Sequence, residues 1–321
     1  MTRSPPAWQR YVGLIAIAVA VASIFLPYWA TFLALIGLAK GLVVLGLMIL
    51  WRTGLVSFGQ GLYYGLGAYT VGLLPQLTGI SDGFVLMIAG TAVATAVSFL
   101  LGFLLRRYRG LFFAMLNLAF SMILFGLLVN SEHLGSTDGF NIANITYAGY
   151  APEGLDSQRT LYVITVALVI GAGWLAYRYL NSTMGHLTTA IRDNEIRVEY
   201  LGFSVERAVH AKYVIACALA GLGGTIAAIG VGHIDPETTV YWLQSGEFVF
   251  VTVLSGTGHP VAPFLGAIIF ELLRSFALEY APNIWQMIVG IALLACIMFL
   301  PDGLWSLLVR RRAETRNADR S

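Results

Sequence analysis

Charged residues are scarce in this chain. They make up 11% of its 321 residues, whereas 58% of the residues are hydrophobic; soluble domains carry about 25% charged residues. Several uninterrupted apolar runs reach the ~20 residues that a helix needs to cross a bilayer. The runs are continuous rather than alternating, which argues against a membrane β-barrel. The composition therefore predicts an all-α polytopic membrane protein.

Motifs that would indicate an enzyme or a cofactor site are also lacking. The sequence contains no GxxxxGK[ST] motif for ATP binding through a P-loop, and no HExxH motif for a metal. Its two cysteines, Cys217 and Cys296, lie inside apolar runs and lack metal-ligand spacing. The net charge of +2 gives no indication of nucleic-acid binding. We expect a non-catalytic chain with no metal, no cofactor and no nucleic-acid partner.

Hydropathy divides the chain into apolar segments that together form a single transmembrane domain over 1–321. Arg3 and Arg10 before the first segment imitate a signal peptide, but the apolar run continues too far, so we interpret it as a retained first span. The prediction is about 8 full transmembrane helices plus one re-entrant hairpin. The segments are 11–30, 32–50, 54–77, 84–105, 111–130, 160–179, 209–232, 248–276 and 284–302.

The loops between these segments differ in charge. Lys and Arg gather near both termini, at Arg52, at 106–109 and at 178–212, whereas 78–83, 131–158 and 233–247 carry acids but no Lys or Arg. Because cytoplasmic loops are enriched in basic residues, both termini are predicted to be cytoplasmic. We expect a cytoplasmic loop at about 181–208, a periplasmic loop at about 131–159 and a cytoplasmic tail at about 303–321.

Strict alternation of spans fails after residue 247, because one crossing by 248–276 would put the basic tail outside. A hairpin of half-helices that turns at 256–260 and is entered from outside restores the alternation. Gly59 and Gly67-Ala68 have the same spacing as Gly258 and Gly266-Ala267. We expect an inverted repeat, a plan common in transporters, with helix packing by small residues as the alternative.

The stretch from Gly185 to Ser204 concentrates charge in an otherwise apolar chain. Its apolar residues recur at helical spacing, which predicts a helix of ~15 residues, about 22 Å long, ended by Gly202. Such a helix suits a groove on a protein partner; a lipid-surface helix and a solvated linker are the alternatives.

Polar residues inside apolar segments are candidates for function because they are costly in lipid. Gln60, Tyr63, Tyr64 and Asn117, with the glycines Gly59, Gly67 and Gly258, are the candidates for a translocation path. Hydrogen bonding between helices explains the polar ones equally well. For Lys40, Glu271 and Arg274 we favour a structural role, with Glu271 and Arg274 paired at i,i+3.

A series of motifs then resembles one family along nearly the whole chain. They are Gly54-Leu55-Val56-Ser57-Phe58-Gly59-Gln60-Gly61, Arg109-Gly110-Leu111-Phe112-Phe113-Ala114, Asn117-Leu118-Ala119-Phe120, Ala190-Ile191-Arg192-Asp193-Asn194-Glu195 with Leu201-Gly202, Ala218-Leu219-Ala220-Gly221-Leu222-Gly223-Gly224 and Pro301-Asp302-Gly303-Leu304. Their order resembles the LivM-type permease subunit of branched-chain amino acid ABC importers.

The resemblance implies a bacterial inner-membrane subunit that forms a translocation path. Its partners would be a LivH-type second permease, two P-loop ATPase subunits that bind ATP and Mg, and a periplasmic binding protein. The segment 185–203 would be the coupling loop to the ATPase. The coupling residues would be Gly185, Ile191, Arg192, Asp193, Asn194, Glu195, Arg197 and Gly202.

The resemblance leaves the substrate open. Leu134-Gly135-Ser136 stands where the family usually has a TGG-type run, and Gly185-His186 replaces the more usual Gly-Arg. Permeases for urea, amides and aromatic acids are similar. An ion-coupled secondary transporter is the alternative from another class, since inverted repeats would suit it too; a membrane enzyme ranks last.

Overall fold

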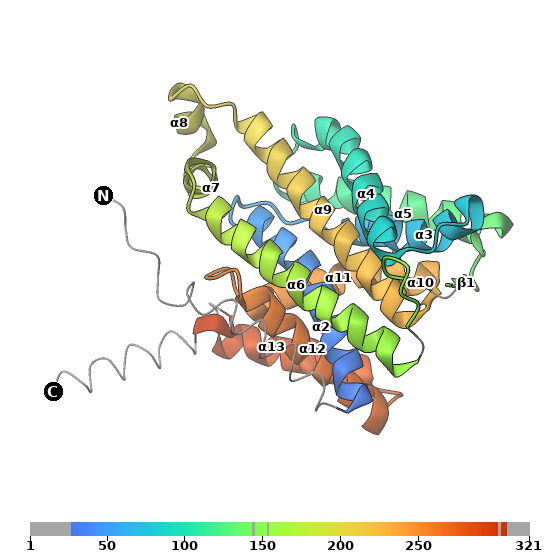
Figure 1. Cartoon of the computed structure of the whole chain (residues 1–321). Helices are drawn as coiled ribbons and strands as arrows, with labels where there is room; N and C mark the ends of the chain where they lie inside the picture. The colour runs from blue at the N-terminus through green and yellow to red at the C-terminus, as the bar shows by residue number, and fades with distance from the viewer. Residues whose placement is uncertain (1–26, 143–144, 153, 301–302, 307–321) are drawn as a thin grey trace.

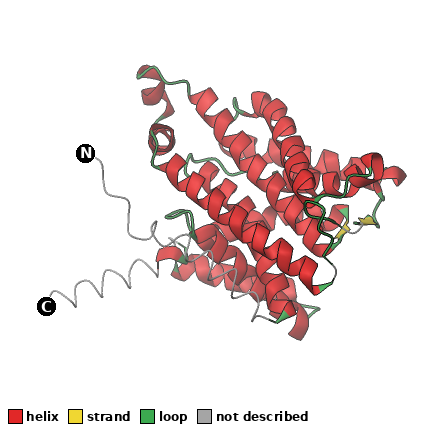
Figure 2. Ribbon diagram, viewed as in Figure 1, coloured by secondary structure: helices red, strands yellow, loops and turns green. Residues whose placement is uncertain are grey.

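The computed structural model is an assembly of helices with very little other secondary structure (Figures 1 and 2). It describes residues 27–142, 145–152, 154–300 and 303–306. The helices are α2 (Tyr28–Trp51), α3 (Gln60–Thr78), α4 (Gly83–Leu105), α5 (Gly110–Val129), α6 (Leu155–Leu180), α7 (Thr183–Asp193), α8 (Glu195–Tyr200), α9 (Val205–Val231), α10 (Pro236–Thr239), α11 (Trp242–Ser255), α12 (Ala262–Tyr280) and α13 (Trp285–Phe299), with the 3-10 turn η1 (Glu132–Leu134).

The two ends of this assembly differ in character. One end carries α7 and α8, and we call it the α8 end. The opposite end, which we call the β end, carries the two short antiparallel strands β1 (Phe140–Asn141) and β2 (His233–Ile234). The predicted acidic loop 131–159 runs between α5 and α6 at the β end, where β1 holds it to the end of α9.

Helices α2 and α9 form the centre, because small residues let their backbones come close. A Cβ on Gly46 would lie 2.6 Å from the carbonyl oxygen of Ala216, and one on Gly223 would lie 2.5 Å from that of Ala39. Helix α3 meets α9 in the same way at Gly67. Close approach of this kind is the usual basis of helix association in membranes, where apolar side chains gain nothing from leaving lipid.

Two irregular segments lead from opposite ends of the assembly into its interior, where both contact α5. Residues 52–59 lead from α2 to α3, and a Cβ on Gly59 would lie 2.6 Å from the carbonyl oxygen of Asn117. Residues 235–241, which include the single turn α10, lead from α9 to α11, and Ser121 Oγ donates to the Val240 carbonyl at 2.9 Å. The Gly61 amide donates to Ser245 Oγ at 2.9 Å, so the helix starts that follow the two segments touch.

The turn between α11 and α12 falls at 256–261, where the sequence places it. Its depth differs from the expected one, which was the middle of the membrane in a re-entrant hairpin. Arg52 donates to the carbonyls of Thr257 at 2.8 Å and Gly258 at 3.0 Å, and His259 stacks on Trp305 at 4.7 Å. The turn therefore lies at the α8 end. The expected equivalence of Gly59 and Gly258 is wrong, because Gly59 lies against Asn117 in the interior.

Several helices begin or end at other residues than the segments predicted from hydropathy. Tyr28 and Trp29 belong to α2 rather than to a first span, and residues 11–26 of the expected 11–30 span lie outside the described residues, as does most of the 303–321 tail. Helix α3 begins only at Gln60. Within the described residues five helices are long and apolar enough to cross a membrane, against the about 8 predicted from hydropathy: α2, α4, α5, α6 and α9.

Candidate functional site

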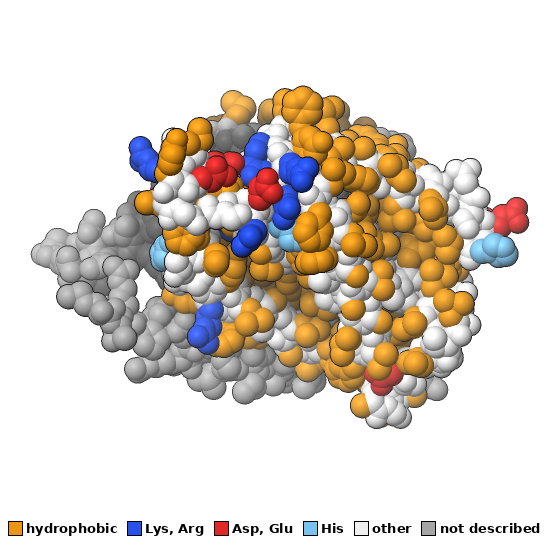
Figure 3. Space-filling view, turned by 90° about the horizontal axis from the view of Figure 1, so that it is seen from above, with side chains coloured by type: hydrophobic (Ala, Val, Ile, Leu, Met, Phe, Trp, Pro, Cys, Tyr) orange, Lys and Arg blue, Asp and Glu red, His pale blue; other side chains and the backbone are white. Residues whose placement is uncertain are grey.

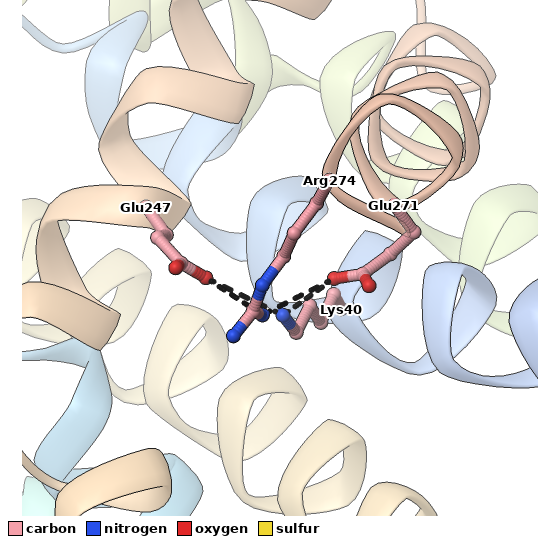
Figure 4. Close-up of polar contacts among 4 residues, drawn as sticks. All are labelled: Lys40, Glu247, Glu271 and Arg274. Carbon is pink, nitrogen blue, oxygen red and sulfur yellow. Dashed lines mark hydrogen bonds and ion pairs between the residues drawn. The ribbon is translucent and has the colours of Figure 1, made fainter. Parts of the chain in front are cut away.

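Four charged side chains meet between α2, α11 and α12 (Figure 4). Lys40 Nζ lies 2.5 Å from Glu271 Oε1 and 3.4 Å from Glu247 Oε2, and Arg274 Nη1 lies 3.3 Å from the same Glu247 oxygen. Arg274 and Glu271 are 3.9 Å apart at i,i+3, as the sequence suggests. We call Lys40, Glu247, Glu271 and Arg274 the charge cluster. Its two cations and two carboxylates balance, which is the condition for keeping charge out of water.

A cavity of about 240 Å³ adjoins the charge cluster on the side of the β end. Lys40, Glu271 and Arg274 form part of its wall, together with Tyr64 from α3. His233 of β2, the irregular segment 235–241 and Gln244 of α11 form the rest of the polar lining. Broken helices and irregular backbone at membrane depth are found where they line a cavity. We call this space the charged cavity.

A second polar group joins α3, α5 and α9. Tyr63 and Tyr213 share a hydrogen bond of 2.7 Å between their hydroxyls, and Tyr213 donates to Asn117 Oδ1 at 2.6 Å. Asn117 in turn donates to the Phe113 carbonyl at 2.8 Å. All three polar side chains are almost fully buried. In this conformation Tyr63 and Asn117 thus make the hydrogen bonds between helices that the sequence left as an alternative.

The other path candidates are distributed among different surroundings. Gln60 is fully buried, and its amide makes no hydrogen bond with the described residues. Tyr64 borders the charged cavity. Gly59 and Gly67 are close-packing positions against Asn117 and Gly221, whereas Gly258 lies at the α8 end. The structure therefore brings Tyr63 and Asn117 together but separates them from Tyr64 and Gly258.

The charged stretch forms two helices instead of the single one expected. Asn194 interrupts it: its backbone is extended, with φ −162°, and its Oδ1 accepts from the Arg197 amide at 3.0 Å as the N-cap of α8. This side-chain bond satisfies a free helix-start donor, which is why Asn competes with a continuous helix here. Gly202, with φ +85°, follows the end of α8, and Ser204 caps α9 as predicted.

Ion pairs hold α8 and the start of α9 against the loop between α4 and α5. Arg109 Nε donates to Glu195 Oε1 at 2.7 Å, and Arg106 Nε lies 3.2 Å from Glu206 Oε2 at the start of α9. Most of the charged side chains on this face lie close together, and the rest of the face is largely hydrophobic or uncharged (Figure 3). Among the expected coupling residues Gly185 and Ile191 are buried, and Arg192, Asp193, Asn194, Arg197 and Gly202 are exposed.

Exposed apolar side chains project from the same short element. Ile196 is 66% exposed, Tyr200 is 89% exposed and Leu201 is 71% exposed. Hydropathy could not single them out, because they are isolated in a polar segment. Because the resemblance in sequence predicts coupling to an ATPase here, we call α7 and α8 with Leu201 the coupling segment, and these three side chains its apolar tip.

Sequence reasoning missed several residues of these sites. Glu247 was counted with the acids of an outer loop, because only the fold shows that α11 starts at Trp242. Tyr213 and Gln244 gave no signal, since a Tyr in an apolar run and a Gln near a segment end are ordinary. Among the described residues no group of three His, Cys, Asp or Glu side chains is placed to hold a metal ion.

Sequence comparisons find relatives of this chain among permease proteins. Residues 28–298 match the family model described as branched-chain amino acid transport system / permease component. The chain is 29% identical to the high-affinity branched-chain amino acid transport system permease protein LivM of Escherichia coli, over 82% of this chain and 67% of that protein. LivM of Salmonella typhimurium is 28% identical over the same shares.

A more distant relative shows the breadth of the group. The nucleoside ABC transporter permease protein NupB of Lactococcus lactis is 26% identical over 42% of this chain and 37% of that protein. No solved structure matches the chain. The family model covers most of the described residues, from α2 into α13. The chain therefore belongs to the family of permease components of branched-chain amino acid transport systems.

Proposed function

We propose that this chain is the membrane permease subunit of an ABC importer for branched-chain or related amino acids. It forms part of the translocation pathway, and partner subunits hydrolyse ATP. The observation that carries this proposal is the coupling segment, a short exposed element with an apolar tip at one end of the apolar helices. Exposed apolar residues on a small rigid element are typical anchors for a protein partner.

The geometry of the coupling segment suits transmission of movement. Its buried side is fixed by Ile191 and Val198, each 2% exposed, and its flank is fixed by the Arg109–Glu195 ion pair. A force on the apolar tip would therefore move the start of α9 and the loop between α4 and α5 together. Helix α9 runs through the centre of the assembly, so such movement would reach the irregular segments beside α5.

The two irregular segments support a pathway between two related halves. Helix α2, the segment 52–59 and α3 correspond to α9, the segment 235–241 and α11, taken in the opposite direction. The helices that follow fit the same pairing, because α4 packs on α9 and its counterpart α12 packs on α2. An inverted repeat with this pairing, in place of the Gly59–Gly258 pairing, would put substrate contacts where the broken segments meet.

The proposal implies the following assembly. The partners are a LivH-type second permease, two P-loop ATPase subunits that hold ATP and Mg, and a periplasmic binding protein. The chain itself is non-catalytic and lies in the bacterial inner membrane with both termini in the cytoplasm. The α8 end faces the cytoplasm and the β end faces the periplasm, in agreement with the arginines at 106–109.

The charge cluster supports one alternative. An ion-coupled secondary transporter needs acids at membrane depth, and Glu247 and Glu271 are two such acids, with side chains 10% and 12% exposed. Their pairing with Lys40 and Arg274 favours a fixed cluster over a carrier of ions. Within the family, urea, amides and aromatic acids are the alternatives to a branched-chain amino acid as the substrate.

Reconstitution tests the proposal directly. The chain is inserted into liposomes with its partner permease and ATPase subunits, and uptake of tritiated L-leucine is measured with binding protein outside and ATP inside. We expect uptake that requires ATP and continues when an ionophore removes ion gradients. Uptake by the chain alone that follows an ion gradient without ATP would establish the alternative.

A further inference from the structure

The charged cavity contains polar groups that its own ion pairs do not use. Arg274 Nε and Gln244 Nε2 are buried donors without a hydrogen-bond partner among the described residues, and both residues line the cavity. Gln244 is 6% exposed. A buried donor without a partner costs free energy. These two unused donors indicate that an acceptor belongs in the cavity.

The geometry of the guanidinium group narrows the chemistry of that acceptor. Arg274 uses Nη1 for Glu247, and its central guanidinium carbon lies 5.4 Å from the centre of the Trp285 ring, which restricts the orientation of the group. A planar guanidinium with a free edge matches a carboxylate better than any single-atom acceptor. The Gln244 amide adds one more donor. Arg274 and Gln244 together therefore form a carboxylate-binding pair.

The charge balance of the cavity restricts the ligand further. The charge cluster is neutral by itself and Asp235 adds one carboxylate to the cavity wall, so a bound carboxylate alone would increase an uncompensated negative charge out of water, which is costly. Glu271 at the cavity wall and Asp235 on the irregular segment supply carboxylate oxygens for a cation. A ligand that carries both charges on one small head group adds no net charge.

Apart from His233, the remaining lining is mostly apolar and small. Ile36, Ala68, Ala227 and Ala228 line the cavity beside the charged groups. Its volume of about 240 Å³ is below the ~300–1,000 Å³ of sites for drug-sized ligands. Space of this size and lining suits a short aliphatic side chain.

We propose that the charged cavity is a binding site for a zwitterionic α-amino acid with an aliphatic side chain. Arg274 and Gln244 bind its carboxylate, and Glu271 with Asp235 binds its ammonium group. This inference rests on the proposed permease function and adds a substrate site within the membrane part, separate from any site on a soluble binding protein.

Direct binding tests the site. The chain is purified with its partner permease and ATPase subunits in lipid nanodiscs, without the binding protein, and titrated with tritiated L-leucine. We expect saturable binding that unlabelled leucine displaces. Isocaproate, which lacks the ammonium group, and isoamylamine, which lacks the carboxylate, should compete far more weakly. Isocaproate adds negative charge beside Glu271 and Asp235, and isoamylamine leaves the Arg274 and Gln244 donors without an acceptor.

Two variants locate the binding. Arg274→Met should weaken leucine binding by at least about tenfold, because hydrogen bonds to charged groups are lost. Thr238→Trp should also weaken it, because Thr238 is exposed and lines the cavity, so the larger ring fills the entrance without removing a member of the charge cluster. The matched control is Arg106→Met, which removes an arginine paired with Glu206 at the α8 end and should leave leucine affinity unchanged.

The outcomes separate this inference from the proposed function. If Arg274→Met does not yield a folded protein, Thr238→Trp decides alone. Wild-type affinity in Thr238→Trp, or no leucine binding by the wild-type complex that still shows ATP-driven uptake, would overturn the charged cavity as a substrate site. Absence of ATP-driven uptake would instead overturn the permease proposal itself.

Discussion

At the scale of single residues, the charge cluster shows how a membrane helix retains a lysine. Lys40 is 5% exposed in the middle of α2, a helix that is otherwise apolar. Its ammonium group is placed between the two glutamates, and Arg274 completes the balance. Each charge is stabilised by the opposite charges around it, so the free-energy change on removing one depends on which charges remain.

Replacing Lys40 alone should be strongly destabilising, because Lys40→Met leaves two carboxylates for one arginine. We expect a loss of about 3–5 kcal/mol in the free energy of unfolding, the range for breaking a buried ion pair. Thermal unfolding in detergent measures the change. The double variant Lys40→Met with Glu271→Gln is the control, since it leaves a balanced Arg274–Glu247 pair and should recover most of the loss. A double variant as unstable as the single one would show that charge balance is not the cause.

At the scale of elements, short irregular pieces and caps set the positions of the longer helices. Asp82 is an example at the β end. Its Oδ1 accepts from the amides of Phe84 and Val85, which start α4, and its Oδ2 accepts from the Ala148 amide. One carboxylate thereby caps a helix and holds the loop between α5 and α6.

Asp82→Ala should lower the free energy of unfolding by about 0.5–2 kcal/mol, the usual consequence of losing an N-cap. It should also make the loop near residues 145–150 more sensitive to protease, because the Ala148 contact is lost. Asp82→Asn keeps an acceptor for the helix amides and should recover most of the stability, but its amide nitrogen cannot accept from Ala148, so the loop should stay sensitive to protease. Limited proteolysis and thermal unfolding provide the two readings; equal values for the Asp82→Ala variant and wild type would contradict the cap.

The coupling segment provides the second prediction at this scale. Glu195 pairs with Arg109 within the chain, so the apolar tip, and not Glu195, should carry contact with an ATPase subunit. We expect Tyr200→Ala to weaken ATPase binding by at least about tenfold, as for an aromatic anchor at an interface. Surface plasmon resonance on the permease pair gives the affinity.

Tyr150→Ala is the matched control for Tyr200→Ala. Tyr150 is 60% exposed, but it lies in the loop at the β end. Its replacement should leave ATPase binding unchanged. If Tyr200→Ala binds the ATPase as tightly as wild type while Glu195→Ala does not, the polar flank and not the apolar tip is the contact.

At the scale of the whole molecule, the turn at 256–261 fixes the direction of the last helices. Its hydrogen bonds to Arg52 place it at the α8 end, so α12 must run toward the β end. Val261 at the turn is 41% exposed and Tyr280 at the far end of α12 is 79% exposed. These two positions can therefore show whether the two ends of α12 lie on opposite sides of the membrane.

In a Cys296→Ser background we expect Val261→Cys to react with a membrane-impermeant maleimide only from the cytoplasmic side. Tyr280→Cys should react only from outside. The remaining native thiol, Cys217, is fully buried. Labelling of intact cells and of inverted vesicles, read by mass shift, makes the comparison. Reaction of both positions from the same side would contradict the course of α12.

The sequence alone determined the class of the protein. Hydropathy fixes where apolar helices must form, since backbone groups in lipid have to be satisfied within the helix. It predicted α4, α5, α6 and α9 to within a few residues, and it predicted the turn near 256–260. The motifs from Gly54 to Gly303 identified the family, and Gly202 and Ser204 identified helix boundaries through local capping chemistry.

Only the tertiary structure decided which residues meet. Lys40 and Glu247 are 207 positions apart, and the local sequence around either residue does not predict their contact. The break at Asn194, the contact of Arg52 with the 256–261 turn and the role of Tyr213 likewise emerge only from the folded chain. Periodicity and propensity report on neighbours within a turn or two of the chain, whereas burial, ion pairing and cavity shape arise from packing between helices. That packing depends on the close approach of α2, α3 and α9, which the glycines permit but do not by themselves specify.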